Sequence, residues 1–246
     1  MERILLRIAI ATVLALLSIA CKGSDWQTLR PGLEYRYYSP HLIPTTASSV
    51  YAFRIDLNLF QLRLITAKSL GMKATYVNDF AKKSGALIAV NGGFFSTDKE
   101  ELGLRIQNGK IISPLRNISW WGVFYIQNKI PKISSMKNFQ MQSNIDFAIQ
   151  SGPRLLVNNQ HLKLSPGRDL RSALCIDSQN RVIIAVTNNL PLTTNQFASV
   201  LQKFGCRDAL NLDGGNSSQI YAKTAKLKVD IETYRQVADA LGVFPR

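Results

Sequence analysis

Apolar residues recur along most of this chain in short alternating or continuous runs, and this pattern predicts many more strands than helices. Residues 50–55 and 59–65 alternate apolar and polar positions on either side of 56–58, which is typical of a β-hairpin. Further hairpins are expected at three places: 104–107 with 110–113, 120–126 with 130–134, and 172–176 with 181–187. Short buried strands are expected at four places: 86–90, 147–150, 155–157 and 209–212.

Only two segments have the apolar spacing of a helix. Residues 76–83 follow Thr75, a candidate N-cap, and precede Gly85. Residues 195–204 follow Thr194, a second candidate cap, and precede Gly205. The pattern therefore predicts one α+β domain with a mixed, mostly antiparallel sheet and few helices. The strand–helix–strand segments 60–90 and 182–212 leave room for two parallel crossovers.

The first 49 residues differ from the rest. Arg3 and Arg7 precede an apolar run at 8–17 that is too short to span a membrane, so residues 1–20 are expected to be a signal peptide. The small residue before Cys21 resembles a bacterial lipoprotein signal, which makes Cys21 the expected lipidation site and the outer membrane the expected location. A soluble secreted protein is the alternative. Residues 21–49 contain three prolines and are expected to be irregular, although Tyr35, Tyr37 and Tyr38 suggest an early edge strand.

Charge restricts the kind of partner. The chain has 30 Lys and Arg against 16 Asp and Glu, a net charge of +14, which favours anionic ligands such as phosphates and acidic glycans. The basic residues are scattered, and no nucleic-acid-binding motif is present, so nucleic acid is not an expected partner. Cys175 and Cys206 fit either a disulfide of an oxidising compartment or two buried thiols.

Three strands end in glycine-containing polar loops, and these loops carry the candidate chemistry. Asp213-Gly214-Gly215-Asn216-Ser217-Ser218 follows the strand at 209–212 and would place a carboxylate at the strand end. Asn91-Gly92-Gly93 and Ser151-Gly152-Pro153-Arg154 have the same arrangement. A hairpin turn with ordinary loop composition is the alternative for the Asp213 loop.

These loops, together with Arg171-Ser172-Ala173, resemble the phosphodiester glycosidase family in motif order and spacing. The resemblance covers residue 50 to the C-terminus, the expected domain 50–246. Asn216 replaces a glycine that is usual in the family, and Ser172 replaces a threonine. The resemblance implies a hydrolase that cleaves a sugar–phosphodiester bond, here on envelope or extracellular glycans.

The resemblance also implies roles for individual residues. Arg154 and Arg171 would bind phosphate through paired hydrogen bonds, and Asp213 would act near the anomeric carbon as base, nucleophile or electrostatic stabiliser. Glu101 is the candidate second carboxylate, with a solvated loop acid as its alternative. The implied substrate-binding set is Asn91, Gly92, Gly93, Ser151, Gly152, Arg154, Arg171, Gly214, Gly215, Asn216, Ser217 and Ser218.

No cofactor is expected. His41 and His161 lack metal-ligand spacing, although a divalent cation at Asp213 stays open as an alternative. Two other functions stay open as well. One is a non-catalytic module of the same fold that binds anionic polysaccharide during export or assembly, and the other is an envelope scaffold.

Overall fold

The computed structural model describes residues 25–40 and 47–246. The expected signal peptide, Cys21 and His41 lie outside the described residues. No helix in the described part of the chain is long and apolar enough to cross a membrane.

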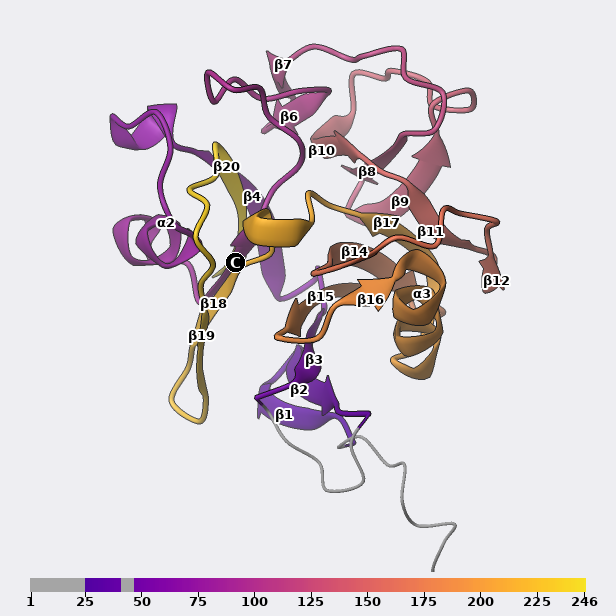
Figure 1. Ribbon diagram of the computed structural model, residues 1–246. Coiled ribbons are helices and arrows are strands. Elements are labelled where there is room, and N and C mark those ends of the chain that lie inside the picture. Colours follow the sequence, from indigo (N-terminus) through magenta and orange to yellow (C-terminus); the bar gives the residue numbers. More distant parts are fainter. Residues whose placement is uncertain (1–24, 41–46) are drawn as a thin grey trace, which may run out of the picture.

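The described residues form twenty strands, two α-helices and two short 3₁₀ helices (Figure 1). The helical elements are η1 (Lys68–Leu70), α2 (Val77–Ser84), α3 (Thr194–Lys203) and η2 (Gly215–Ser217). The first ten strands are β1 (Gln27–Arg30), β2 (Leu33–Tyr38), β3 (Ser49–Ile55), β4 (Phe60–Thr66), β5 (Ile88–Asn91), β6 (Arg105–Gln107), β7 (Lys110–Ser113), β8 (Gly122–Gln127), β9 (Ile130–Ser135) and β10 (Ile145–Ser151). The last ten are β11 (Arg154–Val157), β12 (Gln160–His161), β13 (Arg168–Asp169), β14 (Ser172–Asp177), β15 (Val182–Asn188), β16 (Leu192–Thr193), β17 (Cys206–Asn211), β18 (Ile220–Lys223), β19 (Lys228–Ile231) and β20 (Asp239–Pro245).

The strands form three main sheets and one small pair. An eight-stranded sheet has the order β1-β2-β3-β15-β14-β17-β11-β12, and two five-stranded sheets have the orders β7-β6-β10-β8-β9 and β19-β18-β5-β20-β4. Strands β13 and β16 pair separately. The protein is therefore mostly β, and the expected α+β class describes it only loosely.

Every strand pair in the described part of the chain is antiparallel, so the expectation of a mixed sheet with parallel crossovers is wrong. The two strand–helix–strand segments exist, but β20 lies between β4 and β5, and β14 lies between β15 and β17. Strand β20 comes from the C-terminal part of the chain and β14 directly precedes β15, so both inserted strands lie outside the two segments whose periodicity suggested the crossovers.

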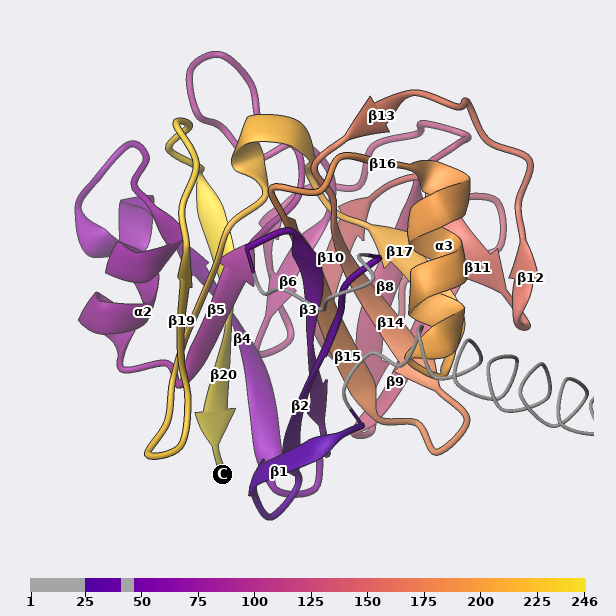
Figure 2. The same cartoon turned by 60° about the horizontal axis from the view of Figure 1, so that its bottom comes forward.

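The main core lies where the three large sheets face one another. Its buried residues include Phe53, Phe124, Ile184, Leu210 and Leu241, which come from all three sheets. Figure 2 shows α2 and α3 on opposite outer sides of the molecule. Helix α3 packs on the eight-stranded sheet through Phe197 and Leu201, and α2 packs on the β18–β5–β20 sheet. This arrangement leaves the strand ends with their polar loops outside the core.

The strands at 50–55 and 59–65 are confirmed, but their hairpin pairing is wrong. Strand β3 pairs with β2 and β15, whereas β4 pairs with β20 in a different sheet. Six of the seven residues of β3 are buried, so the strand is covered on both faces and has no solvent-exposed side. The turn at 56–58 carries the chain from one sheet to the next.

The other three hairpins are confirmed. Asn108 and Gly109 connect β6 and β7 with φ of 52° and 73°, and Asn128 and Lys129 connect β8 and β9 with φ of 51° and 65°. Two successive positive φ angles match the twist of the flanking strands. The third hairpin joins β14 and β15.

Both helices are confirmed, with differences in their caps. Thr193, not Thr194, caps α3, because its side chain accepts from the Gln196 N–H and the Gln196 side chain accepts from the Thr193 N–H. Tyr76 is the N-cap of α2 without a side-chain cap, and the Thr75 hydroxyl instead contacts the Asp79 carboxylate at 2.7 Å.

The expectation of an irregular segment at 21–49 is wrong for 27–38. Strands β1 and β2 extend the eight-stranded sheet through β3, and Leu33 and Tyr35 are buried against the main core. The strand suggested by the three tyrosines is therefore present as β2, but β1 covers its outer side, so β1 and not β2 is the edge of the sheet.

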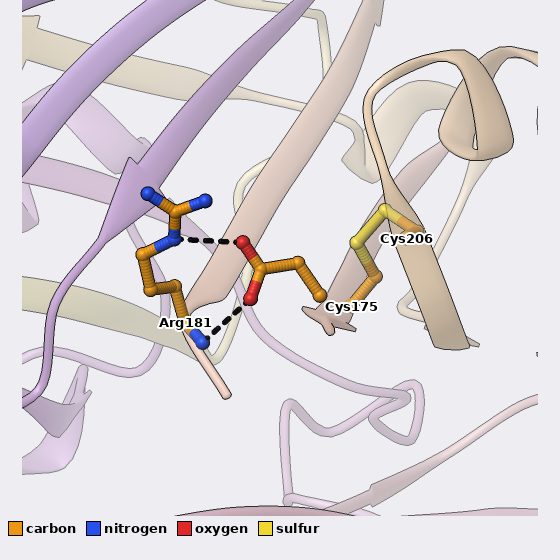
Figure 3. The surroundings of a disulfide bond; sticks show 4 residues. Cys175, Arg181 and Cys206 are labelled. Carbon is orange, nitrogen blue, oxygen red and sulfur yellow. Dashed lines mark hydrogen bonds and ion pairs between the residues drawn. A yellow bond between two sulfur atoms is a disulfide. The ribbon is translucent and has the colours of Figure 1, made fainter. Parts of the chain in front are cut away.

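Cys175 and Cys206 form a disulfide, with their Cα atoms 5.7 Å apart (Figure 3). The bond joins the neighbouring strands β14 and β17 beneath α3, where both cysteines are buried. Nearby, Arg181 binds the Asp177 carboxylate through its backbone N–H and its Nε. The sequence left a disulfide and two buried thiols open for Cys175 and Cys206, and the structure has the disulfide.

Candidate functional site

The glycine-containing loops converge through backbone hydrogen bonds. The Asp213 N–H donates to the Gly92 carbonyl at 3.2 Å, which joins the loop after β17 to the loop after β5. The Asn211 N–H donates to the Pro153 carbonyl at 2.9 Å, which joins the loop after β10 to the same place. The Gly215 N–H donates to the Leu170 carbonyl at 2.9 Å. Four segments that are far apart in the sequence therefore build one site.

Asn91 lies at the centre of this convergence and is fully buried. Its Nδ2 donates to the Asp213 carbonyl at 2.8 Å, and its Oδ1 accepts from the Ser172 hydroxyl at 2.7 Å and from the Gln219 N–H at 3.2 Å. The resemblance implies that Asn91 holds sugar hydroxyls. In the structure its amide positions the surrounding loops instead.

Gly92 and Gly93 leave room for a buried ion pair. A Cβ on Gly92 would lie 2.0 Å from Asp239 Oδ1, and a Cβ on Gly93 would lie 2.5 Å from Arg105 Nη2. Arg105 and Asp239 are 0% and 1% exposed at the side chain, and Arg105 Nε donates to Asp239 Oδ2 at 2.6 Å. The guanidinium also donates to the Gln150 carbonyl at 3.0 Å. The glycine pair is needed because these two side chains pack against its backbone.

Asp213 is the carboxylate of the site. It is partly buried, and burial is the main cause that raises the pKa of Asp213. The Ser217 side chain, Arg235 and the Gly214 N–H lower this pKa, and the negative charge of Asp239 adds to the rise. The Gly214 N–H donates to Asp213 Oδ1 at 3.1 Å. A carboxylate held in this way is a candidate for chemistry.

Arg171, the first of the two arginines implied by the resemblance, borders the Asp213 loop. It donates to the carbonyls of Gly167 at 2.6 Å and Leu192 at 3.1 Å, and burial lowers its pKa while Asp169 raises it. Its Nη1 lies 3.9 Å from the position of a Cβ on Gly214, so the guanidinium lies against the backbone that follows Asp213.

Arg154 is half-buried and belongs to none of the ion pairs or side-chain hydrogen bonds within 25–40 and 47–246. Each arginine lines a cavity, of about 270 Å³ for Arg154 and about 550 Å³ for Arg171. The two cavities are adjacent because both are lined by Trp120, Pro153, Lys163 and Leu164. Neither arginine forms a salt bridge within the described residues.

Trp120 is 56% exposed on the shared wall of these cavities. Its ring meets Trp121 and Phe94 edge-on, with centroids 5.8 Å and 6.1 Å away. Phe95, in contrast, is buried against α2. Phe95 therefore belongs to the core, whereas Phe94 borders the site.

The remaining implied residues divide into buried and accessible positions. Ser151, Gly152, Ser217 and Ser218 are buried, and the hydroxyls of Ser151 and Ser218 have no hydrogen-bond partner within the described residues. Asn216 is exposed and lines a separate cavity of about 360 Å³ with Tyr76 and Tyr234.

Glu101 forms an isolated bridge with Phe95, and its negative charge helps to raise the pKa of Lys68. Asp239, in contrast, is linked to Asp213 through Gly92, whose carbonyl accepts from the Asp213 N–H and whose N–H donates to the Asp239 carbonyl at 3.0 Å. No contact between Glu101 and Asp213 is found within the described residues, and a catalytic role of Glu101 stays a prediction.

Sequence reasoning missed Arg105, Asp239, Lys99 and Arg235. A usable signal was present for the first two, since each is a charged residue inside an otherwise apolar strand segment. Lys99 and Arg235 lie in loops of ordinary composition, so only the fold brings them together.

Comparison with known proteins identifies the family. The family model for phosphodiester glycosidase matches residues 84–244, well over half of the chain. The chain belongs to the phosphodiester glycosidase family. All four converging loops of the site lie within the matched residues, and the resemblance seen in the sequence is confirmed. No curated protein sequence matches this chain.

Solved structures that are similar to this chain include the following two. One is the zebrafish N-acetylglucosamine-1-phosphodiester alpha-N-acetylglucosaminidase catalytic domain auto-inhibited by its pro-peptide, with a TM-score of 0.69 and 19% identity over 92% of this chain and 87% of that one. The other is a hypothetical protein from Synechocystis, with a TM-score of 0.64 and 15% identity over 90% of this chain. This chain spans 64% of the Synechocystis protein, slightly under two thirds.

A metal site was the open alternative at Asp213. Within 25–40 and 47–246, no group of three or more His, Cys, Asp and Glu side chains is arranged to hold a metal ion. Asp213 Oδ1 accepts from the Gly214 N–H, and Asp239 Oδ2 accepts from Arg105, so both neighbouring carboxylates already have protein partners.

Proposed function

We propose that this protein is an exported hydrolase that cleaves a sugar–phosphodiester bond, on envelope or extracellular glycans. Family membership supports a glycosidase-type function. The observation that carries the proposal is the convergence of a partly buried carboxylate, Asp213, with Arg171 at the edge of its loop. A glycosyl phosphodiester has one group for each of these two side chains. Its anomeric carbon is the partner of the carboxylate, and its anionic phosphate leaving group is the partner of the arginine.

Arg154 and Arg171 supply positive charge for the phosphate. Phosphate is already a good leaving group, so the reaction needs charge stabilisation more than proton donation. Arg154 has no competing partner in the described part of the chain, and a guanidinium binds phosphate oxygens in pairs. Neutralising the phosphate in this way would favour departure of the leaving group.

Asp213 acts at the anomeric carbon, where positive charge develops as the bond breaks. Burial makes its ionised form less stable in the free protein, and a developing positive charge reverses this penalty in the transition state. Asp239 is tied to Arg105 in a buried ion pair and contributes through its charge. A single acting carboxylate is sufficient here because the leaving group needs no strong acid.

Release of free sugar tests this proposal. Wild-type protein is expected to release N-acetylglucosamine from methyl α-N-acetylglucosaminyl phosphate, and Asp213→Asn is expected to lower kcat by about 10²–10⁴-fold. Asp208→Asn is a matched control, since Asp208 lies on β17, the strand that leads to Asp213, and pairs with Arg207.

The same experiment addresses the main alternative. If the wild-type protein binds anionic glycan but turns over no phosphodiester, the protein is a non-catalytic binding module of this fold. We also propose export through the N-terminal segment and lipidation at Cys21, which metabolic labelling with a palmitate analogue would test.

A further inference from the structure

Lys99 and Arg235 form a second pair of cations, distinct from Arg154 and Arg171 of the proposed phosphate site. Lys99 lies at the tip of the turn 96–100, and Arg235 lies in the loop that leads into β20. Lys99 Nζ lies 4.7 Å and Arg235 Cζ 5.0 Å from the centroid of the same Phe95 ring. Two segments from distant parts of the sequence therefore bring like charges to one aromatic ring.

This arrangement leaves an excess of positive charge. Burial is the larger cause that lowers the pKa of Lys99, the proximity of Arg235 lowers it further, and Asp213 raises it. Arg235 has no ion pair in the described part of the chain, and Lys99 Nζ donates to the Gln236 carbonyl at 3.1 Å. Hydrogen bonds connect this pair to the Asp213 loop. Gln219 Nε2 donates to the Arg235 carbonyl at 2.6 Å, and the Gln219 N–H donates to Asn91 Oδ1 at 3.2 Å. Asn91 Nδ2 in turn donates to the Asp213 carbonyl at 2.8 Å.

The charge excess is not part of the proposed phosphate site. Arg171 lies against Gly214, which follows Asp213, whereas Lys99 and Arg235 lie on the ring of Phe95. Phe95 belongs to the loop of Gly92, whose carbonyl accepts from the Asp213 N–H. Two cationic groups from different elements are therefore connected to the backbone around Asp213. An anion beside Lys99 and Arg235 would complete the charge balance, and cations on an aromatic ring remain available to bind it.

We propose that Lys99 and Arg235 form a subsite for a carboxylate on the sugar whose anomeric bond is cleaved, so that the preferred substrate is a phosphodiester of an acidic sugar. This inference rests on the proposed function and specifies in addition that the sugar of the substrate is negatively charged. The net charge of +14 agrees with a polyanionic substrate.

A matched pair of substrates tests the subsite. The methyl phosphodiesters of α-glucose 1-phosphate and α-glucuronic acid 1-phosphate differ only in a hydroxymethyl group against a carboxylate. The wild-type protein is expected to have a kcat/KM about 10- to 100-fold higher for the glucuronic acid diester, which is the range of a charge-assisted hydrogen bond. Lys99→Gln and Arg235→Gln are each expected to remove most of this preference.

Arg63→Gln is the matched control. Arg63 Cζ lies 4.5 Å from the Phe244 ring centroid, so it is also a cation on an aromatic ring, but it lies on β4. This variant is expected to keep the preference for glucuronic acid. Equal losses on both substrates in Lys99→Gln and Arg235→Gln would overturn the proposal, because they would show that these cations bind the phosphate common to both.

Calorimetric titration of both diesters separates this inference from the proposed function. If the wild-type protein hydrolyses neither diester but binds the glucuronic acid diester about tenfold more tightly, and Arg235→Gln removes this difference, the subsite stands and the catalytic proposal fails. Equal affinities for both diesters, or no binding of either, would overturn the subsite.

Discussion

Replacing Asp239 with asparagine is expected to destabilise the protein strongly while changing its shape very little. The substitution keeps the size of the side chain and removes its negative charge, which leaves the Arg105 guanidinium without a counter-ion. Both side chains are buried, at 0% and 1% exposure. The remaining contacts of the guanidinium are with neutral carbonyls, including those of Gln150 and Phe94.

The magnitude follows from this burial. Breaking a buried ion pair by removing one partner costs about 3–5 kcal/mol, because the other charge stays buried and uncompensated. Since small proteins unfold with about 5–15 kcal/mol in total, Asp239→Asn is expected to remove a large part of the stability. Gly92→Ala is expected to act in the same direction, because its Cβ would lie 2.0 Å from Asp239 Oδ1 and displace the carboxylate.

Urea denaturation at neutral pH measures this cost, and an exposed ion pair provides the matched control. Lys68 and Glu100 also form an ion pair, but their side chains are 55% and 57% exposed. Glu100→Gln is expected to leave the urea midpoint nearly unchanged, because solvent screens an exposed ion pair. If Asp239→Asn costs no more than Glu100→Gln, Asp239 is neutral in the folded protein and the reasoning about this ion pair is refuted.

Three further predictions concern stability. Replacing Cys175 and Cys206 with alanine is expected to cost about 3–4 kcal/mol by the loop-closure relation for a separation of 31 residues, and an unchanged urea midpoint would contradict it. Thr193→Ala removes the cap of α3 and is expected to cost about 1 kcal/mol, measured as a fall in Tm, whereas an unchanged Tm would show that the cap contributes nothing. The raised pKa of Asp213 means that its contribution to stability is complete below its ordinary pKa of 3.8 and is lost as the pH rises through the raised value. Asp213→Asn is therefore expected to gain stability relative to wild type between acidic and neutral pH, and a parallel pH profile of the two proteins would contradict this.

Local signals predicted the elements of this fold well. Asn108-Gly109 specifies its turn because both residues accept positive φ, and the spacing of Phe197 and Leu201 specifies a helix face. The pairing of β4 with β20 has no such signal, since the partners are the start and the end of the domain. For this reason the strand at 59–65 was expected in the right place with the wrong neighbour.

The site was predictable to the extent that its chemistry lies in motifs. Asp213 and Arg171 follow from the order of the loops, and the structure brings them to one place. Lys99 and Arg235 carry no motif and meet only because two loops pack on Phe95. Asn91 differs from both groups. It lies in a motif that predicts ligand binding, but its amide binds the Asp213 carbonyl and the Ser172 hydroxyl of the protein itself.

The position of bond cleavage tests the central claim most directly. Hydrolysis of a glycosyl phosphodiester in H₂¹⁸O, followed by mass spectrometry of both products, shows whether water attacks carbon or phosphorus. The proposed role of Asp213 at the anomeric carbon predicts that the label appears in the released sugar and not in the phosphate. Label in the phosphate would show attack at phosphorus, and would contradict a glycosidase site built around Asp213.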